Sequence, residues 1–167
     1  FFLMVGLFKP HTPFNSPQRY WEHYDREAIP LAEHPFPPRD VPGKYAMNAW
    51  RYVRSFQNIP DQGAIPDDLA REIRHAYYAC VSYVDAQVGR LVSTLERHHL
   101  TSNTVIVVWS AHGYQLGEHG MWCKHTNFET STRVPLIVAI PGMPTAGQAS
   151  NGLVELVDVY PTLAEIC

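Results

Sequence analysis

A long polar segment, residues 109–135, separates two of the most apolar runs in the chain. Residues 104–108 precede it and residues 134–140 follow it. The segment holds three histidines, a lysine, a cysteine and two glutamates, is punctuated by glycines, and shows no helical or strand period. Connections of this length between buried strands are usually functional or disordered, and the aromatic residues here argue against disorder. We therefore predict a functional loop between two strands.

The apolar runs predict an α/β fold. Residues 1–7, 104–110 and 134–140 are continuous apolar runs, which is typical of strands buried on both faces. Residues 67–99 carry apolar side chains at three- and four-residue steps, which is typical of an amphipathic helix that packs on a core, and residues 153–166 repeat the pattern. Buried strands that alternate with helices indicate a largely parallel mixed sheet flanked by helices.

The chain length of 167 residues and the 46% hydrophobic composition fit one domain with a real core. Residues 15–65 hold half of the prolines with aromatic residues between them, which predicts a long surface excursion with short helical turns, one of them at 17–24. The chain starts inside an apolar run without Met and stops at the end of an amphipathic pattern. We therefore expect residues 1–167 to form a single partial domain of a longer protein.

Charge and cysteine patterns exclude several classes of protein. A net charge of -3 and a pI near 6.3, with scattered charges, provide no basic surface for nucleic acid. No apolar run approaches the roughly 18 residues that a membrane span needs, and residues 1–8 lack the flanks of a signal peptide. The three cysteines, Cys80, Cys123 and Cys167, are far apart and form no Cys-x-x-Cys pattern, so neither a disulfide framework nor a zinc knuckle is indicated.

Two polar segments, residues 9–14 and 111–133, each follow a predicted strand, at the edge where α/β sheets bind ligands. They hold four of the nine histidines, and imidazole and ammonium groups suit an anion. Metal binding is an alternative, including a zinc site whose spacing matches no established pattern. The candidate residues for the anion site are His11, His112, His119, Lys124 and His125. Those for a metal are His112, Glu118, His119 and Glu129, and the zinc alternative uses His112, His119, Cys123 and His125.

Several motifs in the chain match one known family. They are Ser-Ala-His-Gly at 110–113, Leu-Gly-Glu-His-Gly at 116–120, Trp-x-Lys-x-x-Asn-Phe at 122–128, Arg-Val-Pro-Leu at 133–136, Lys-Pro-His-x-Pro-Phe at 9–14 and the helical segment at 77–89. In these motifs the chain resembles the sulfatases of the alkaline phosphatase superfamily, most of all the iduronate 2-sulfatase type. The segment at 153–163 is similar to a helix of that family. The resemblance runs over nearly the whole chain and implies an alkaline-phosphatase-like sulfatase domain.

The resemblance implies an enzyme that removes sulfate from a sulfated sugar or glycosaminoglycan. Such enzymes use calcium and a formylglycine nucleophile, which is made from a cysteine in a Cys-x-Pro-x-Arg motif. By motif position, Lys124 would hold a sulfate oxygen as a compact point charge, His11 would bind sulfate or serve the leaving group, and His125 would contact the substrate. His112 would contact or ligate calcium. Family members are usually lysosomal, periplasmic or secreted, and neither the particular sugar nor the oligomeric state is indicated.

The chain departs from the family pattern in three ways. No cysteine lies in a Cys-x-Pro-x-Arg context, and an Asp-Asp pair that supplies metal ligands is missing. Both are expected upstream of Phe1. Ala111 occupies the position of a metal-ligand aspartate, and alanine offers calcium no side-chain oxygen.

These departures leave three hypotheses. The first is a fragment of an iduronate-2-sulfatase-like enzyme whose nucleophile is encoded outside these residues. The second is a catalytically impaired or inactive relative that binds sulfated glycans, which the alanine at 111 favours. The third is a phosphatase or phosphonate hydrolase of the same superfamily.

Overall fold

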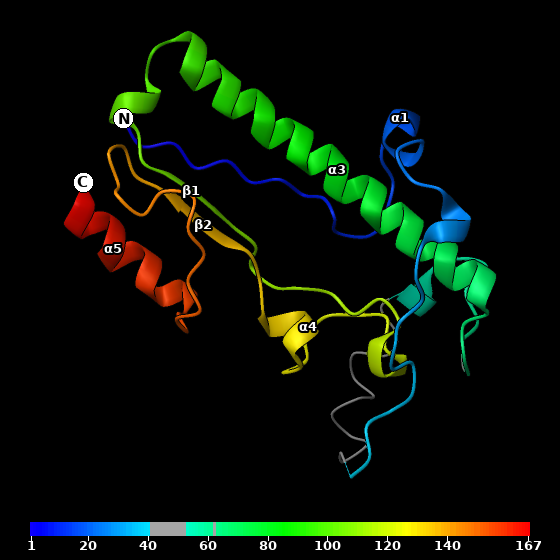
Figure 1. Cartoon of the computed structure of the whole chain (residues 1–167). Coiled ribbons are helices and arrows are strands. Elements are labelled where there is room, and N and C mark those ends of the chain that lie inside the picture. Colours follow the sequence, from blue (N-terminus) through cyan, green and yellow to red (C-terminus); the bar gives the residue numbers. More distant parts are fainter. Residues whose placement is uncertain (41–52, 62) are drawn as a thin grey trace.

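The structure is a computed structural model that describes residues 1–40, 53–61 and 63–167. Its other elements are arranged around one long helix. Helix α3, Asp67–Arg97, confirms the amphipathic helix predicted at 67–99 (Figure 1). Acidic side chains occupy its first turn and Arg97 its last turn, where they offset the helix dipole. Among the described residues, no helix is apolar enough over a sufficient length to cross a membrane.

The other helical elements are short. Helix α1 lies inside the predicted surface excursion and packs against α3, and it confirms the short helical turn predicted at 17–24. Part of that excursion, residues 41–52 and 62, lies outside the described residues. The short elements are α1 (Gln18–Trp21), α4 (Glu129–Thr132), α5 (Val159–Ile166) and the 3-10 turns Arg26–Ala28, Val53–Ser55, Thr101–Asn103, Glu118–Gly120 and Leu156–Asp158.

Helix α5 is shorter than the helix predicted at 153–166. A 3-10 turn precedes it, and the side chains of Glu155 and Asp158 each accept a hydrogen bond from the backbone of the other, which caps that turn. Pro161 is the third residue of α5. A proline is tolerated in the first turn because the N–H groups there have no partner inside the helix.

The sheet differs from the prediction. Strands β1 (Ile106–Trp109) and β2 (Leu136–Ala139) confirm two predicted strands, but they pair antiparallel, with Ile106 opposite Ala139 and Trp109 opposite Leu136. The described sheet has only these two strands, so the fold is α/β without confirming a largely parallel sheet.

The prediction of a buried strand at residues 1–7 is wrong for the described structure. These residues form no strand and are exposed, with Phe1 at 87% and Phe2 at 79% exposure. An extended segment needs a neighbouring strand to pair its backbone N–H and C=O groups. No described strand pairs with this segment.

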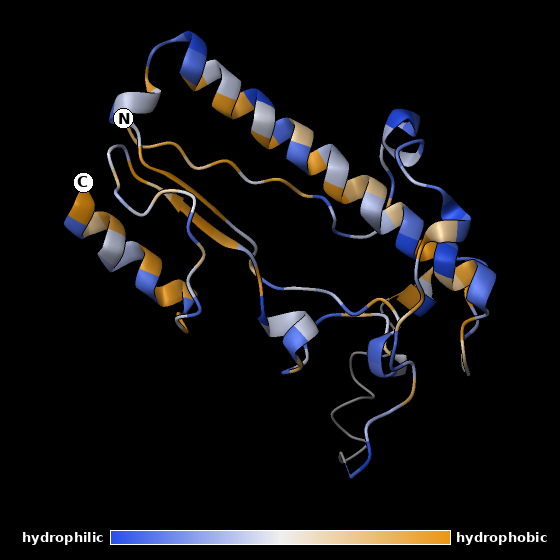
Figure 2. Cartoon of the chain, in the orientation of Figure 1, coloured by the Kyte–Doolittle hydropathy of each residue, from blue (hydrophilic) through white to orange (hydrophobic). Residues whose placement is uncertain are grey.

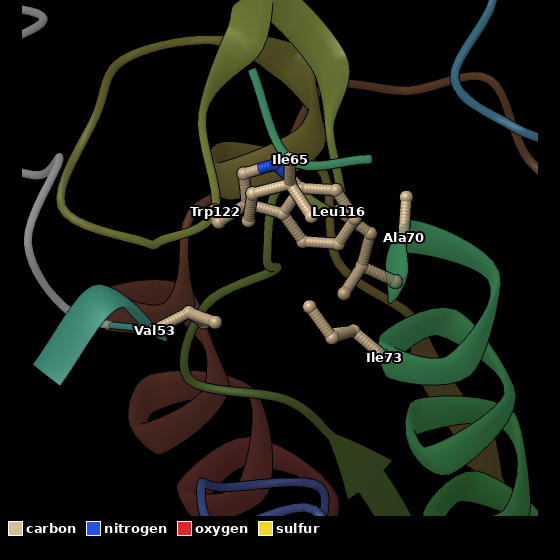
Figure 3. Close-up of a cluster of buried hydrophobic side chains, with 6 residues drawn as sticks. All are labelled: Val53, Ile65, Ala70, Ile73, Leu116 and Trp122. Carbon is tan, nitrogen blue, oxygen red and sulfur yellow. The ribbon is translucent and has the colours of Figure 1, made fainter. Parts of the chain in front are cut away.

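The hydrophobic core lies beside the first half of α3 and away from the sheet. Six buried side chains form it, contributed by α3, by the segments before it and by the polar segment after β1 (Figure 3). No residue of α3 beyond Cys80 is buried, so only half of the predicted apolar stripe is core. Figure 2 shows the apolar residues 1–8 and both strands in orange, and much of this surface is exposed. The six core residues are Val53, Ile65, Ala70, Ile73, Leu116 and Trp122.

Candidate functional site

The polar segment after β1 folds back on itself as a small hairpin, residues 115–123. Gln115 N donates to Cys123 O at 2.7 Å, and Cys123 N donates to Gln115 O at 3.2 Å. Gly117 N donates to Met121 O at 2.9 Å, which closes the turn. Gly117 has a φ of 111°, a conformation that an L side chain rarely adopts. The sequence shows no strand period here because so short a ladder leaves little room for alternation.

The inside of the hairpin is a buried polar network around Gln115, whose side chain is fully buried. Its Oε1 accepts hydrogen bonds from Thr126 Oγ1 at 3.2 Å and from Cys123 Sγ at 3.5 Å. Thr126 Oγ1 also lies 2.9 Å from Ser131 Oγ. The network ties the hairpin to helix α4, because Ser131 belongs to that helix.

Cys123 is a structural residue in this network. Burial raises the pKa of its thiol to about 12, against a smaller opposing effect of a backbone hydrogen bond at Trp122. At neutral pH the thiol therefore stays protonated, and a protonated thiol is not a nucleophile. His119, another residue of the zinc alternative, packs its ring on Phe128 with a centroid separation of 4.4 Å. The geometry gives the zinc alternative no support.

The two polar segments predicted to carry the site meet on α3. The ring of Phe14, from the first segment, contacts Tyr77 of α3 and Tyr114 of the second segment, with centroid distances of 5.3 and 5.5 Å. Tyr77 and Tyr114 also contact each other at 5.9 Å. Burial raises the pKa of Tyr77, so its hydroxyl stays neutral. These three rings join segments more than 60 residues apart in sequence, since Phe14 lies 63 positions before Tyr77.

The first segment holds His11 in a tight bend. His11 Nδ1 lies 2.8 Å from Thr12 O, and its ring packs on Phe8 at a centroid distance of 4.7 Å. Lys9 Nζ donates to Pro13 O and to Asn15 Oδ1 across the same bend. The peptide bonds before Pro10 and Pro13 are cis. The bend therefore fixes the backbone on both sides of His11.

The second segment contains a buried lysine and two exposed histidines. Lys124 directly follows the hairpin and is 7% exposed. His125 is exposed with a φ of 63°, and its ring lies 6.5 Å from that of His112, also exposed. His112 Nδ1 lies 2.8 Å from Gly113 O, which leaves Nε2 as the nitrogen directed away from its own backbone. Lysine and imidazole donors in one short stretch suit an anion with several oxygens.

The described residues do not fit a calcium site by themselves. Among residues 1–40, 53–61 and 63–167, no group of three or more His, Cys, Asp or Glu side chains could hold a metal ion. Ala111 is exposed beside His112 and contributes no oxygen. The carboxylate of Glu118 is already engaged, because Leu116 N donates to one of its oxygens at 2.6 Å and Arg74 Nη1 to the other at 3.1 Å. A metal would therefore need ligands from outside the described residues.

Sequence reasoning missed two residues that shape the site. Arg74 lies on the buried side of α3 and reaches the hairpin. Gly113 lies so close to α4 that an added Cβ would fall 2.0 Å from Thr130 O. Neither carried a clear signal in the sequence, because adjacent residues of a helix point to different faces and Arg74, next to Ile73, has the character of a surface residue.

Comparisons with known proteins show the family of the chain. A family model described as Sulfatase matches residues 1–167. Human iduronate 2-sulfatase is 40% identical over 194 residues, which cover 98% of this chain and 35% of the human protein. The solved structure of the yidJ sulfatase candidate of Bacteroides fragilis has a TM-score of 0.66 and 28% identity, over 94% of this chain and 30% of that one.

A phosphonate monoester hydrolase from Silicibacter pomeroyi is a further structural neighbour. It has a TM-score of 0.62 and 27% identity, and the match covers 80% of this chain and 27% of the hydrolase. The chain thus spans about a third of the length of the relatives it matches. Because the family model covers every residue, the chain belongs to the sulfatase family.

Proposed function

We propose that the protein containing this chain is a sulfuric ester hydrolase of the iduronate 2-sulfatase kind, acting on a sulfated sugar. The observation that carries the proposal is the placement of Lys124, a buried ammonium at the end of the hairpin with His125 next in sequence and His112 nearby. The 40% identity to human iduronate 2-sulfatase supports this substrate class. By the same family relation, the compartment would be lysosomal, periplasmic or extracellular.

The chain's own residues would bind and orient the sulfate group. Lys124 would hold one sulfate oxygen, and its burial strengthens that interaction because less water screens it. His125 would contact the sugar or a second oxygen. His11 would bind sulfate or protonate the leaving oxygen from the neighbouring segment, which the contact of Phe14 with Tyr114 joins to the hairpin side.

The nucleophile and the metal are proposed to come largely from outside these residues. Formylglycine would supply the attacking oxygen, and calcium would neutralise charge on the sulfate. Among the described residues we offer only His112 to the metal, so its other ligands would come from elsewhere in the protein.

We expect the 167-residue chain alone to show no hydrolysis of an aryl sulfate, while the full-length protein hydrolyses it. The reason is that none of the three cysteines here has the Cys-x-Pro-x-Arg context needed for the nucleophile. Release of nitrophenol from 4-nitrophenyl sulfate measures both proteins. Turnover by the 167-residue chain would contradict the placement of the nucleophile, and an inactive full-length protein would contradict the proposed hydrolase.

A second candidate function is a relative that binds sulfated glycans without turnover. Ala111 favours it, because the expected carboxylate ligand is absent while Lys124 and His112 are present. The likeness to a phosphonate monoester hydrolase keeps phosphonate or phosphate esters as a third candidate. The three candidates differ in what they hydrolyse: the sulfatase an aryl sulfate, the third candidate an aryl ester of a phosphonate, and the glycan-binding relative neither.

We also propose that β1 and β2 are part of a larger, mostly parallel mixed sheet in the whole protein. Further strands of that sheet would lie against β1, β2 and residues 1–8. The exposure of apolar side chains supports this, with Ile137 at 60% and Leu3 at 66%. Contiguous exposed apolar surface marks an interface, here one with the remainder of the protein.

A further inference from the structure

We propose that Arg74 of helix α3 is a positioning residue that holds the hairpin 115–123, and with it Lys124, in a fixed place on the helix. The role of Lys124 as a sulfate ligand rests on the proposed function. The mechanical part of the inference, that Arg74 fixes the hairpin and Lys124, rests on contacts alone.

Arg74 makes two contacts with the hairpin from a buried position. Its residue exposure is 8%, and its Nη1 donates to Leu116 O at 2.7 Å and to Glu118 Oε1 at 3.1 Å. The second oxygen of Glu118 accepts from Leu116 N at 2.6 Å. The three residues therefore form a closed set in which both backbone polar groups of Leu116 are bound by charged side chains.

The geometry of the hairpin explains why Leu116 needs these partners. In an antiparallel pair, alternate residues direct their N–H and C=O groups toward the partner strand or away from it. Gln115 exchanges both of its backbone bonds with Cys123 across the hairpin, and Gly117 donates its N–H to Met121 O. Leu116 between them faces outward, and a buried N–H or C=O left unpaired would be costly.

The side chain of Leu116 also fixes this residue on α3. It packs with Ala70 and Ile73 of α3 and with Trp122 of the returning arm of the hairpin (Figure 3). Apolar packing is not directional, whereas the two bonds from Arg74 fix where the backbone of Leu116 lies along the helix. Lys124 follows Cys123, whose backbone is bonded to Gln115, so the position of Leu116 is passed on to Lys124.

A buried guanidinium is a costly way to fill this place on the helix. The Nε of Arg74 has no hydrogen-bond partner among the described residues. An apolar side chain such as methionine would fill the position without a charge to desolvate. The contribution of Arg74 is therefore better explained by placement of the hairpin than by stability alone.

The test compares Arg74→Met, Arg74→Lys and the control Arg90→Met in the full-length protein. Arg90 lies on the same helix and is exposed, and its side chain donates to Gln87 Oε1 of its own helix at 3.0 Å. One readout is amide hydrogen exchange at Leu116, Gly117 and Cys123. The other is the ¹³Cε signal of Lys124, which is assigned by its loss in a Lys124→Arg variant.

We expect Arg74→Met to accelerate exchange of the hairpin amides about 10- to 100-fold and to move the Lys124 signal toward the averaged position of a mobile lysine. Arg74→Lys, which keeps a charged donor, should restore most of both signals, and Arg90→Met should change neither. A folded Arg74→Met chain with an unchanged Lys124 signal would overturn the inference.

Glu118→Gln keeps the test decisive if Arg74→Met does not fold. The amide keeps an oxygen for Leu116 N but loses the charge that Arg74 binds, so a smaller shift in the same direction is expected. No shift in folded Glu118→Gln would count against the inference. Neither readout requires sulfate hydrolysis, so an inactive full-length protein would count against the proposed function and not against this role of Arg74.

Discussion

Replacing Gly113 by alanine is expected to lower the free energy of unfolding by about 3 kcal/mol or more. The added Cβ would lie 2.0 Å from Thr130 O and 3.0 Å from Thr130 C, both backbone atoms that cannot swing aside. Gly113 N also donates to Ser131 O at 2.8 Å, and this bond holds the two segments at that distance. Relief of the clash therefore requires the segment before the hairpin to separate from α4.

Gly89→Ala is the matched control. Gly89 lies inside helix α3, and a Cβ there would meet no atom within 4 Å. Alanine in a helix interior is favoured over glycine by roughly 1 kcal/mol, so this variant should gain stability. Urea unfolding of both variants at one pH measures the difference. A Gly113→Ala chain as stable as wild type would show that α4 does not lie where the structure places it.

Replacing Ala111 by aspartate in the full-length protein is expected to raise calcium affinity by about 100-fold or more. Loss of partners that only support metal ligands changes metal affinity by about 10- to 100-fold, and a carboxylate that binds the ion directly should matter at least as much. The new side chain would stand next to His112, the chain's other metal candidate. Turnover of sulfate esters should rise with calcium occupancy.

Ala146→Asp controls for the added charge, because Ala146 is exposed in a polar turn far in sequence from the site. Titration calorimetry with calcium measures wild type and both variants. Tight calcium binding by the wild-type protein would show that Ala111 costs the site little. Equal gains in the two variants would show that net charge, and not a ligand, is responsible.

Elements with a local signal could be predicted from the sequence. Helix α3 follows from its apolar period and the charges at its ends, and β1 and β2 follow from short apolar runs bounded by polar residues. The meeting of the two polar segments follows from the rule that ligands bind beyond strand ends, although aromatic contacts on α3, rather than a parallel sheet, join them here.

Features that depend on a partner could not be predicted. Residues 1–7 have the composition of a buried strand, but a strand exists only where a neighbour supplies hydrogen bonds. The pairing direction of β1 and β2 is likewise a property of the assembled sheet. Half of the apolar stripe of α3 stays unburied for the same reason, since burial needs a surface to pack against.

The residue types of the candidate site could be predicted from the sequence, but the residues that hold them in place could not. Lys124, His112 and His125 stand out as polar residues in a glycine-rich stretch, whereas Gln115 and Arg74 look like ordinary surface residues until their burial is known. Arg74 pairs a backbone carbonyl that the hairpin leaves open, and Gln115 pairs the side chains of Thr126 and Cys123 inside it. Which buried polar groups require a hydrogen-bond partner is known only once the backbone is folded.

Binding of a sulfated disaccharide to the full-length protein tests the central claim most directly, because the proposed enzyme and the proposed non-catalytic relative would both hold the sulfate group with Lys124. Calorimetry would compare wild type with Lys124→Ala, and with Gln148→Ala, an exposed position outside the site, as control. Loss of a charge-assisted hydrogen bond of about 1.5–3 kcal/mol predicts a roughly 10- to 150-fold weaker affinity for Lys124→Ala and no change for the control. Equal affinity of Lys124→Ala and wild type would contradict the placement of the sulfate site at the end of the hairpin.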